Sequence, residues 1–90
     1  MYLVISIGNT DNKLTQQEWS NFVQEIDKVI TEYGKVHFFG GASNWLPWQN
    51  VAWIIEVDNH RLSLDRRLEE IRKKYNQDSV FLMVGDGLFI

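Results

Sequence analysis

The chain has no cysteine and no long apolar run, and each of these absences excludes a class of protein; it also has only one proline. Without cysteine, neither a disulfide nor a thiolate zinc site can form, and the composition fits a cytoplasmic protein. A membrane-spanning helix needs about 18 consecutive apolar residues, and no segment supplies them. The opening Met1 to Ile7 lacks a basic leader and a small-residue cleavage site, so we expect a strand there and no signal peptide.

Positive charge is also scarce, with 9 basic against 12 acidic residues and a formal net charge of −3. Proteins that grip a nucleic-acid backbone usually carry a basic stripe, because neutralising phosphates supplies most of the affinity. We therefore expect neither direct backbone binding nor a membrane partner. The 44% of apolar residues can build a core, and 90 residues are enough for one domain, spanning 1–90.

The first half of the chain predicts a strand, a helix and a second strand. Tyr2 to Ile7 is apolar almost throughout, as in a strand buried on both faces. Thr15-Gln16-Gln17-Glu18 is a capping box, and it predicts the start of a helix of about five turns that ends near Tyr33. We expect Gly34 to be a left-handed C-cap and the next strand to span 36–39, ended by Gly40-Gly41.

The second half predicts a strand at 51–57, a helix to about Tyr75 and a strand at 80–84. Asp58, Asn59 and Ser63 compete as the N-cap of this helix. The order β-α-β-β-α-β is typical of an α+β ferredoxin-like sandwich. In that fold a four-stranded antiparallel sheet of order 4-1-3-2 carries two helices on one face.

Such a sheet leaves one face uncovered by helices. If Leu3, Ile5 and Ile7 face the helices, Tyr2, Val4 and Ser6 face the other way. The third strand adds one of two sets to this face, either Val51/Trp53/Ile55 or Ala52/Ile54/Glu56. The fourth strand adds either Phe81/Met83 or Val80/Leu82/Val84. Every combination leaves apolar patches, which commonly mark an interface. We therefore predict a homo-oligomer, with a dimer through the open face as the leading form.

Aromatic residues concentrate between residues 44 and 53, where three of the four tryptophans and the only proline lie. Trp45 and Trp48 can form an aromatic wall that stacks a base, a sugar or a partner's side chain, with Gln49 and Asn50 supplying hydrogen bonds. The alternative is that both tryptophans close the end of the sheet or a dimer seam. Trp53 is expected to be a core residue of a strand.

Two further segments are candidate binding sites. Asn9 follows Gly8 in a strand-to-helix loop, where free N–H groups can hold an anion; a tight turn with side-chain caps is the alternative. Arg66 lies beside Arg67 on the second helix, where the pair can hold a phosphate; a solvated face with interleaved acids is the alternative. His37 and His60 have no second ligand at metal spacing, so we predict no metal, no cofactor and no catalytic residue.

Two resemblances accompany these patterns. The opening Met1 to Ile7 and the order of elements resemble the small CRISPR adaptation nucleases of ferredoxin-like fold. In that family an aspartate ends the first strand and is the proposed metal ligand. Here the strand ends Ile7-Gly8-Asn9 and the first acid is Asp11, inside the loop. The resemblance therefore implies the fold without the residue that would carry the activity.

The second resemblance spans most of the chain. It rests on the segments SIGN, DNKLTQ with EW, and PWQN with Trp53, which are similar to small uncharacterised proteins from bacteria and their phages. No activity comes with that group, and the resemblance implies only a mobile-element protein.

The leading hypothesis is a non-catalytic binding or assembly module that uses the tryptophan-rich loop and the open sheet face. One alternative is a phage counter-defence protein that sequesters a nucleotide signal or occludes a nucleic-acid-binding defence protein. Another is a small cofactor-independent monooxygenase-like enzyme, with Trp45, Trp48, Asn50 and His37 around its substrate. The partner is accordingly expected to be a second copy, another protein or a nucleotide-like small molecule.

Overall fold

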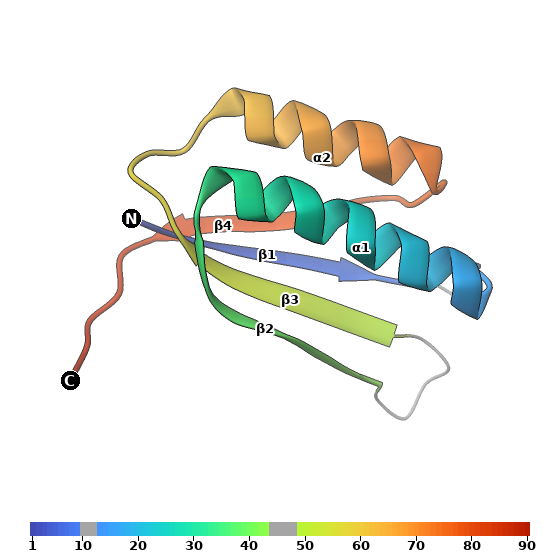
Figure 1. Cartoon of the computed structure of the whole chain (residues 1–90), viewed down its shortest axis with the longest axis horizontal. Helices are drawn as coiled ribbons and strands as arrows, with labels where there is room; N and C mark the ends of the chain where they lie inside the picture. The colour runs from blue at the N-terminus through green and yellow to red at the C-terminus, as the bar shows by residue number, and fades with distance from the viewer. Residues whose placement is uncertain (10–12, 44–48) are drawn as a thin grey trace.

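The computed structural model describes residues 1–9, 13–43 and 49–90 and confirms the ferredoxin-like α+β architecture. Its elements are β1 (Tyr2–Gly8), α1 (Gln16–Tyr33), β2 (Lys35–Ser43), β3 (Gln49–Glu56), α2 (Leu62–Lys74) and β4 (Phe81–Gly85). All neighbouring strands are antiparallel, in the order β2-β3-β1-β4. Both helices lie on one face of the sheet (Figure 1).

The core fills the space between this sheet face and the helices. Leu3 and Ile5 of β1 are fully buried there, and so are their β3 partners Ile55 and Trp53. Burying an apolar side chain of this size contributes about 1.5–3 kcal/mol. The indole N–H of Trp53 donates to Asp27 Oδ1 of α1 at 2.9 Å, so the largest core residue has no unsatisfied polar atom. The register therefore assigns Val51/Trp53/Ile55 to the helices and Ala52/Ile54/Glu56 to the open face.

The start of α1 is the predicted capping box. Thr15 Oγ1 accepts from the backbone N–H of Glu18 at 3.1 Å, and Glu18 Oε1 accepts from the N–H of Thr15 at 3.0 Å. At the other end the prediction of a left-handed C-cap is wrong, because Gly34 is extended with φ −162° and ψ 177°. A glycine stands there for space, since a Cβ would lie 2.5 Å from the backbone oxygen of Glu56.

The predicted end of the second strand at Gly40-Gly41 is also wrong. β2 continues to Ser43, and Gly40 and Gly41 pair with Ala52 and Val51 of β3. A Cβ on Gly41 would lie 2.2 Å from the backbone oxygen of Asn50, so glycine here permits a close approach of two strands.

The second helix begins without the predicted side-chain cap. Its N-cap is Arg61, which makes no capping hydrogen bond, while His60 Nε2 lies 2.7 Å from Asp65 Oδ1 in the first turn. The helix ends as expected near Asn76, which has a left-handed φ of 54°. Within the described parts of the chain, neither helix combines the length and the apolar character needed to span a membrane.

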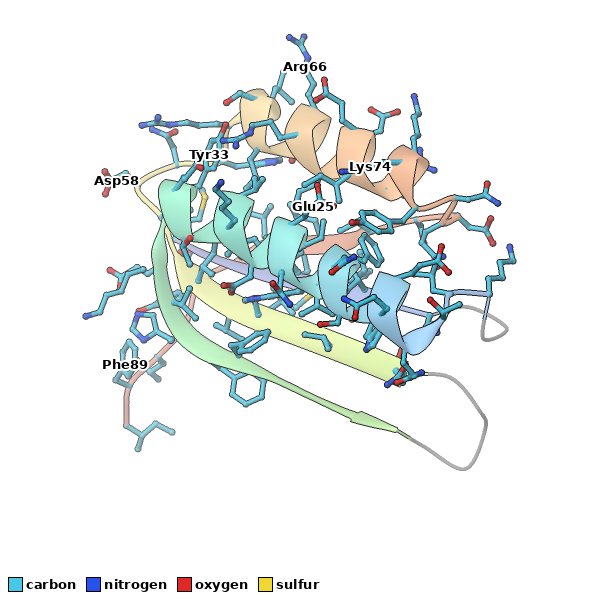
Figure 2. The ribbon with its side chains drawn as sticks, turned by 45° about the vertical axis from the view of Figure 1, so that its right-hand side comes forward. Glu25, Tyr33, Asp58, Arg66, Lys74 and Phe89 are labelled. Atoms are coloured by element: carbon cyan, nitrogen blue, oxygen red, sulfur yellow. The ribbon has the colours of Figure 1, made fainter. Side chains whose placement is uncertain are left out.

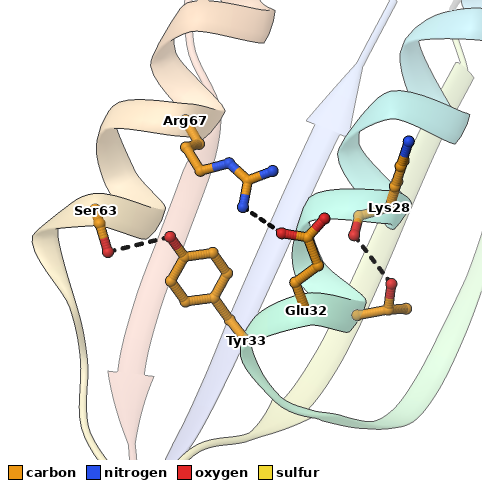
Figure 3. A network of polar contacts seen from close by, with 6 residues as sticks. Lys28, Glu32, Tyr33, Ser63 and Arg67 are labelled. Carbon is orange, nitrogen blue, oxygen red and sulfur yellow. Dashed lines mark hydrogen bonds and ion pairs between the residues drawn. The ribbon is translucent and has the colours of Figure 1, made fainter.

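Polar contacts fasten the two helices to each other at two points. At one end Arg67 pairs with Glu32, and the Tyr33 hydroxyl donates to Ser63 Oγ at 3.1 Å (Figure 3). Further along, Glu25 of α1 accepts from the Tyr75 hydroxyl and from Lys74 Nζ, the latter at 2.8 Å. The Tyr75 ring also stacks on Phe22, with ring centroids 5.1 Å apart.

This contact makes the stability of the protein sensitive to alkaline pH. Burial, together with the hydrogen bond to Glu25, raises the pKa of Tyr75 to about 12, against about 10 in an unfolded chain. As the pH rises, the unfolded chain loses this proton first, so the contribution of Tyr75 is complete below about pH 10 and is lost as the pH approaches about 12. Urea unfolding across this range is expected to show a shallower fall in stability for Tyr75→Phe than for the wild type.

The ultraviolet absorbance of tyrosinate gives a separate check on the same prediction. Tyr75→Phe keeps the stacking on Phe22 but has no hydroxyl to ionise, so the highest phenolate transition is expected to vanish. An unchanged alkaline titration would contradict the assignment to Tyr75.

Candidate interaction surface

The structure brings three of the predicted binding residues together at one end of the sheet. Asn9 follows β1, and its backbone N–H donates to the backbone oxygen of Gln49 at 2.9 Å. Asn50 is opposite Gly8 in the β1–β3 register. The other two loop candidates, Trp45 and Trp48, lie outside the described residues.

Two of these three side chains are engaged within the protein. Asn9 is fully buried; its amide nitrogen donates to the Leu14 carbonyl at 3.1 Å, and its amide oxygen accepts from the Leu14 N–H at 2.9 Å. Gln49 exchanges hydrogen bonds with the side-chain amide of Gln16 at 3.1 Å. Asn9 is therefore bound to Leu14 and offers no surface, whereas the side chain of Asn50 is exposed.

Arg66 lies apart from that group. It extends from the outer side of α2, away from the sheet (Figure 2). Its neighbour Arg67 is bound to Glu32, with its guanidinium carbon 5.7 Å from the centre of the Tyr33 ring. The two arginines therefore do not form a paired clamp for a phosphate in this structure.

The open sheet face is organised as parallel rows that cross all four strands. One row consists of bulky apolar side chains, which in the order β2-β3-β1-β4 are Phe38, Ile54, Val4 and Met83. Phe38 is 50% exposed and Met83 is 52% exposed. This bulky row is a ridge of apolar surface that stays largely exposed at its two ends, on β2 and β4.

The next row along the strands is mostly small. In the same strand order it consists of Gly40, Ala52, Ser6 and Phe81. The first three of these residues line a hollow of about 430 Å³ beside the ring of Phe38. The open face therefore has a ridge and a hollow side by side, and neither row contains a charged residue.

Charge on this face is confined to the end where β1 begins. There β2 has a bulge that leaves His37 without a partner residue in the register, and His37 Nε2 lies 2.9 Å from Glu56 Oε1. The bond to His37 lowers the pKa of the Glu56 carboxyl. Burial raises the pKa of the neighbouring Tyr2 phenol, and the negative charge of Glu56 adds to the effect.

The last residues of the chain cross the open face at the same end. Phe89 lies on the side of the sheet opposite the helices (Figure 2), with its ring 6.0 Å from the rings of both Tyr2 and His37. This tail is Asp86–Ile90, and its residues 86–89 line a pocket of about 470 Å³ together with all four residues of the bulky row. Leu88 and Phe89 nevertheless stay 86% and 76% exposed, so the tail presents apolar surface that the chain itself does not bury.

The chemistry of this surface is that of contact between apolar groups. Among residues 1–9, 13–43 and 49–90, no group of three His, Asp or Glu side chains is placed to hold a metal ion. His37 lies beside Glu56 near the end of β3, and Asn50 lies six residues before Glu56 on the same strand. At the rise per residue of a strand, His37 and Asn50 are therefore roughly 20 Å apart. His37 and Asn50 therefore do not line one pocket, and the other two residues suggested for a substrate pocket, Trp45 and Trp48, lie outside the described residues.

The sequence left the composition of this surface open. Its alternation allowed two choices on β3 and two on β4, and only the register selects Ala52/Ile54/Glu56 and Phe81/Met83 for the open face. The bulge at His37 carries no local signal, because it depends on how β2 pairs with β3.

Comparisons of the chain with family models, with curated proteins and with solved structures gave no match.

Proposed function

We propose that this protein is a non-catalytic assembly module whose open sheet face binds a second copy of the same chain. The observation that carries the proposal is the uncharged ridge and hollow on that face, beside a tail of unburied apolar residues. Apolar surface contributes about 25 cal/mol for each Å² removed from water, which favours covering it.

The relief of the face is complementary to itself. A two-fold axis that crosses the strands between the two rows turns each ridge towards the hollow of the other copy. Ile54 then lies over Ala52 of the partner subunit, and Val4 over Ser6 of the partner subunit. The two sheets pack face to face about 10 Å apart with their strands nearly aligned, as in a β-sandwich.

The same axis gives the exposed apolar tail a surface to contact and keeps the charged residues of the open face at the edge of the dimer. It brings Leu88 and Phe89 of one copy to the end of the partner's sheet where Asn50 is exposed. The pair of His37 and Glu56 stays at the rim, where charges remain hydrated. Each copy carries a formal net charge of −3, yet no like charges meet inside the contact.

Sedimentation equilibrium of the full chain tests this proposal. The wild type is expected to be dimeric or larger at tens of micromolar, and Ile54→Glu is expected to weaken association at least about tenfold by burying a charge in the ridge contact. Ala52→Phe is expected to act similarly without any charge, because its ring fills the hollow. Ile54 and Ala52 both lie on the open face and not in the core, so circular dichroism should show that each variant is a folded monomer.

Leu62→Glu is the matched control. Leu62 is an apolar residue of α2, 67% exposed, in the layer away from the open face. It should leave this association unchanged. A wild type that stays monomeric at tens of micromolar, or an Ile54→Glu variant that associates as tightly as the wild type, would refute the open-face dimer.

A further inference from the structure

The two edges of the sheet differ in how they are protected against pairing with another strand. The edges are β2 and β4. β2 begins with Lys35 and contains the bulge at His37, and both a lysine and a bulge are devices that blunt a strand edge. One edge of this sheet is therefore guarded.

The β4 edge has none of these devices. Its sequence, Phe-Leu-Met-Val-Gly, contains no charge and no proline, and its five residues pair with β1 without a shift in register. Phe81, Met83 and Val84 are 56%, 52% and 44% exposed. In the described part of the chain, no strand pairs with the outer edge of β4. An uncharged and apolar edge of this kind, without a bulge, is a template for another strand.

We infer that β4 pairs antiparallel with β4 of a second copy, across a two-fold axis perpendicular to the sheet. This contact is separate from the open-face contact and does not depend on it. Its product is one continuous sheet of eight strands with all four helices on the same side. The open face of the product is twice as wide as that of one chain.

Side-chain direction selects the register of this pairing. Residues directly opposite each other in an antiparallel pair point to the same face. Leu82 and Val84 face the helices, whereas Phe81 and Met83 face the open side. A register centred on Met83 keeps these faces matched and uses all five residues. Leu82 is then opposite Val84 of the partner subunit, and Phe81 is opposite Gly85 of the partner subunit.

The features that select a second copy as the occupant are on β4 itself. Every pair in this register joins apolar residues or glycine, so no like charges meet and no charge is buried. The flanking acids Asp78 and Asp86 fall opposite Leu88 and Val80 of the partner subunit, so these acids do not face each other. α2, on the β4 side of the sheet (Figure 1), carries both signs of charge, which lets two copies approach.

Cross-linking tests the register, because the chain has no cysteine of its own. In Met83→Cys the two Cα atoms at the axis would be about 4.5–5.5 Å apart, which a disulfide can span. We expect mild oxidation to convert most of this variant into a covalent dimer. Phe39→Cys is the matched control, since Phe39 is 51% exposed but lies on β2, and we expect it to stay mostly monomeric.

A second pair of probes lies on the helix side of β4, which face-to-face packing does not bring together. A mixture of Leu82→Cys and Val84→Cys should give a mixed dimer on oxidation. Val84→Lys should weaken association at least tenfold in sedimentation equilibrium, whereas Phe39→Lys should not. If Val84→Lys does not fold, the cross-linking of the cysteine variants still decides the question.

The outcomes separate the two interfaces. Loss of association in Val84→Lys together with the helix-side cross-link would establish the edge contact. Association that Ile54→Glu abolishes and Val84→Lys leaves intact, without a helix-side cross-link, would overturn the edge contact and leave the open-face dimer standing. A chain that is monomeric under every condition would overturn both.

Discussion

Trp53→Ala is expected to lower the free energy of unfolding by about 3–5 kcal/mol, the range for deleting a large buried aromatic side chain. Trp53 has no exposed surface and is held between β3 and α1 by the bond of its indole N–H to Asp27. A domain of this size is stable by only about 5–15 kcal/mol in total, so this one truncation removes a large share of it. Chemical denaturation followed by circular dichroism measures the loss.

The matched control for this truncation is Phe39→Ala. The Phe39 ring lies against Trp53, with centroids 5.3 Å apart, but it is 51% exposed, so its loss is expected to be below about 1.5 kcal/mol. Equal losses for the two variants would contradict the central place of Trp53 in the core.

Substitutions of Asp27 measure how much the hydrogen bond from the Trp53 indole contributes to stability. Asp27→Ala leaves the indole N–H buried without an acceptor and should cost about 1–3 kcal/mol. In a Trp53→Phe background the donor is absent, so the same change should cost much less. A double-mutant cycle that gave no coupling between these two sites would show that the hydrogen bond contributes nothing to stability.

Asn9→Ala is expected to cost about 2–4 kcal/mol, because it removes the side-chain partners of both the N–H and the C=O of the buried Leu14. Asn9→Asp should not restore the loss at neutral pH. The introduced carboxylate can accept from the Leu14 N–H, but it cannot donate to the Leu14 carbonyl, and its charge would be buried. Thermal unfolding of the three proteins measures these differences.

Acidification gives the distinguishing result for Asn9→Asp. Burial would raise the pKa of the introduced carboxyl above that in the unfolded chain, so the variant should gain stability relative to the wild type as the pH falls and the group is protonated. Asn50→Ala is the control at the same end of the sheet, where the side chain is exposed, and it should change stability by less than about 0.5 kcal/mol. A wild-type-like Asn9→Ala would rule out the proposed role of this residue.

The local signals in the sequence predicted the elements well where each signal was self-contained. The capping box at Thr15 and the apolar spacing after it define α1. The strand at β1 was also predicted, but its burial on both faces is wrong, because only every second residue is buried and the residues between them are only partly buried on the open face. The order of elements then leads to the observed sheet, because few topologies satisfy short connections and right-handed crossovers.

Features that depend on pairing between distant segments could not be predicted in the same way. Gly40 and Gly41 have the residue type of a strand end, but they lie inside β2 because β3 approaches them closely. The candidate site shows the same limit. The sequence indicated Asn9 as a polar loop residue that could bind a ligand. Only the fold shows that its side-chain amide makes hydrogen bonds to the backbone N–H and C=O of Leu14.

The bulge at His37 bears on the size of any assembly this chain forms. A sheet with two open edges adds copies without end and grows into a ribbon, whereas a two-fold contact through one open edge is closed once two copies have met. If β4 pairs as proposed, the extra residue in β2 would therefore stop growth after two copies, because a bulge disrupts pairing at the other edge of the sheet. Removing His37 from the chain would take away one of the two devices that guard the β2 edge and leave only Lys35, so strand addition at both edges, and growth into a filament, would become easier.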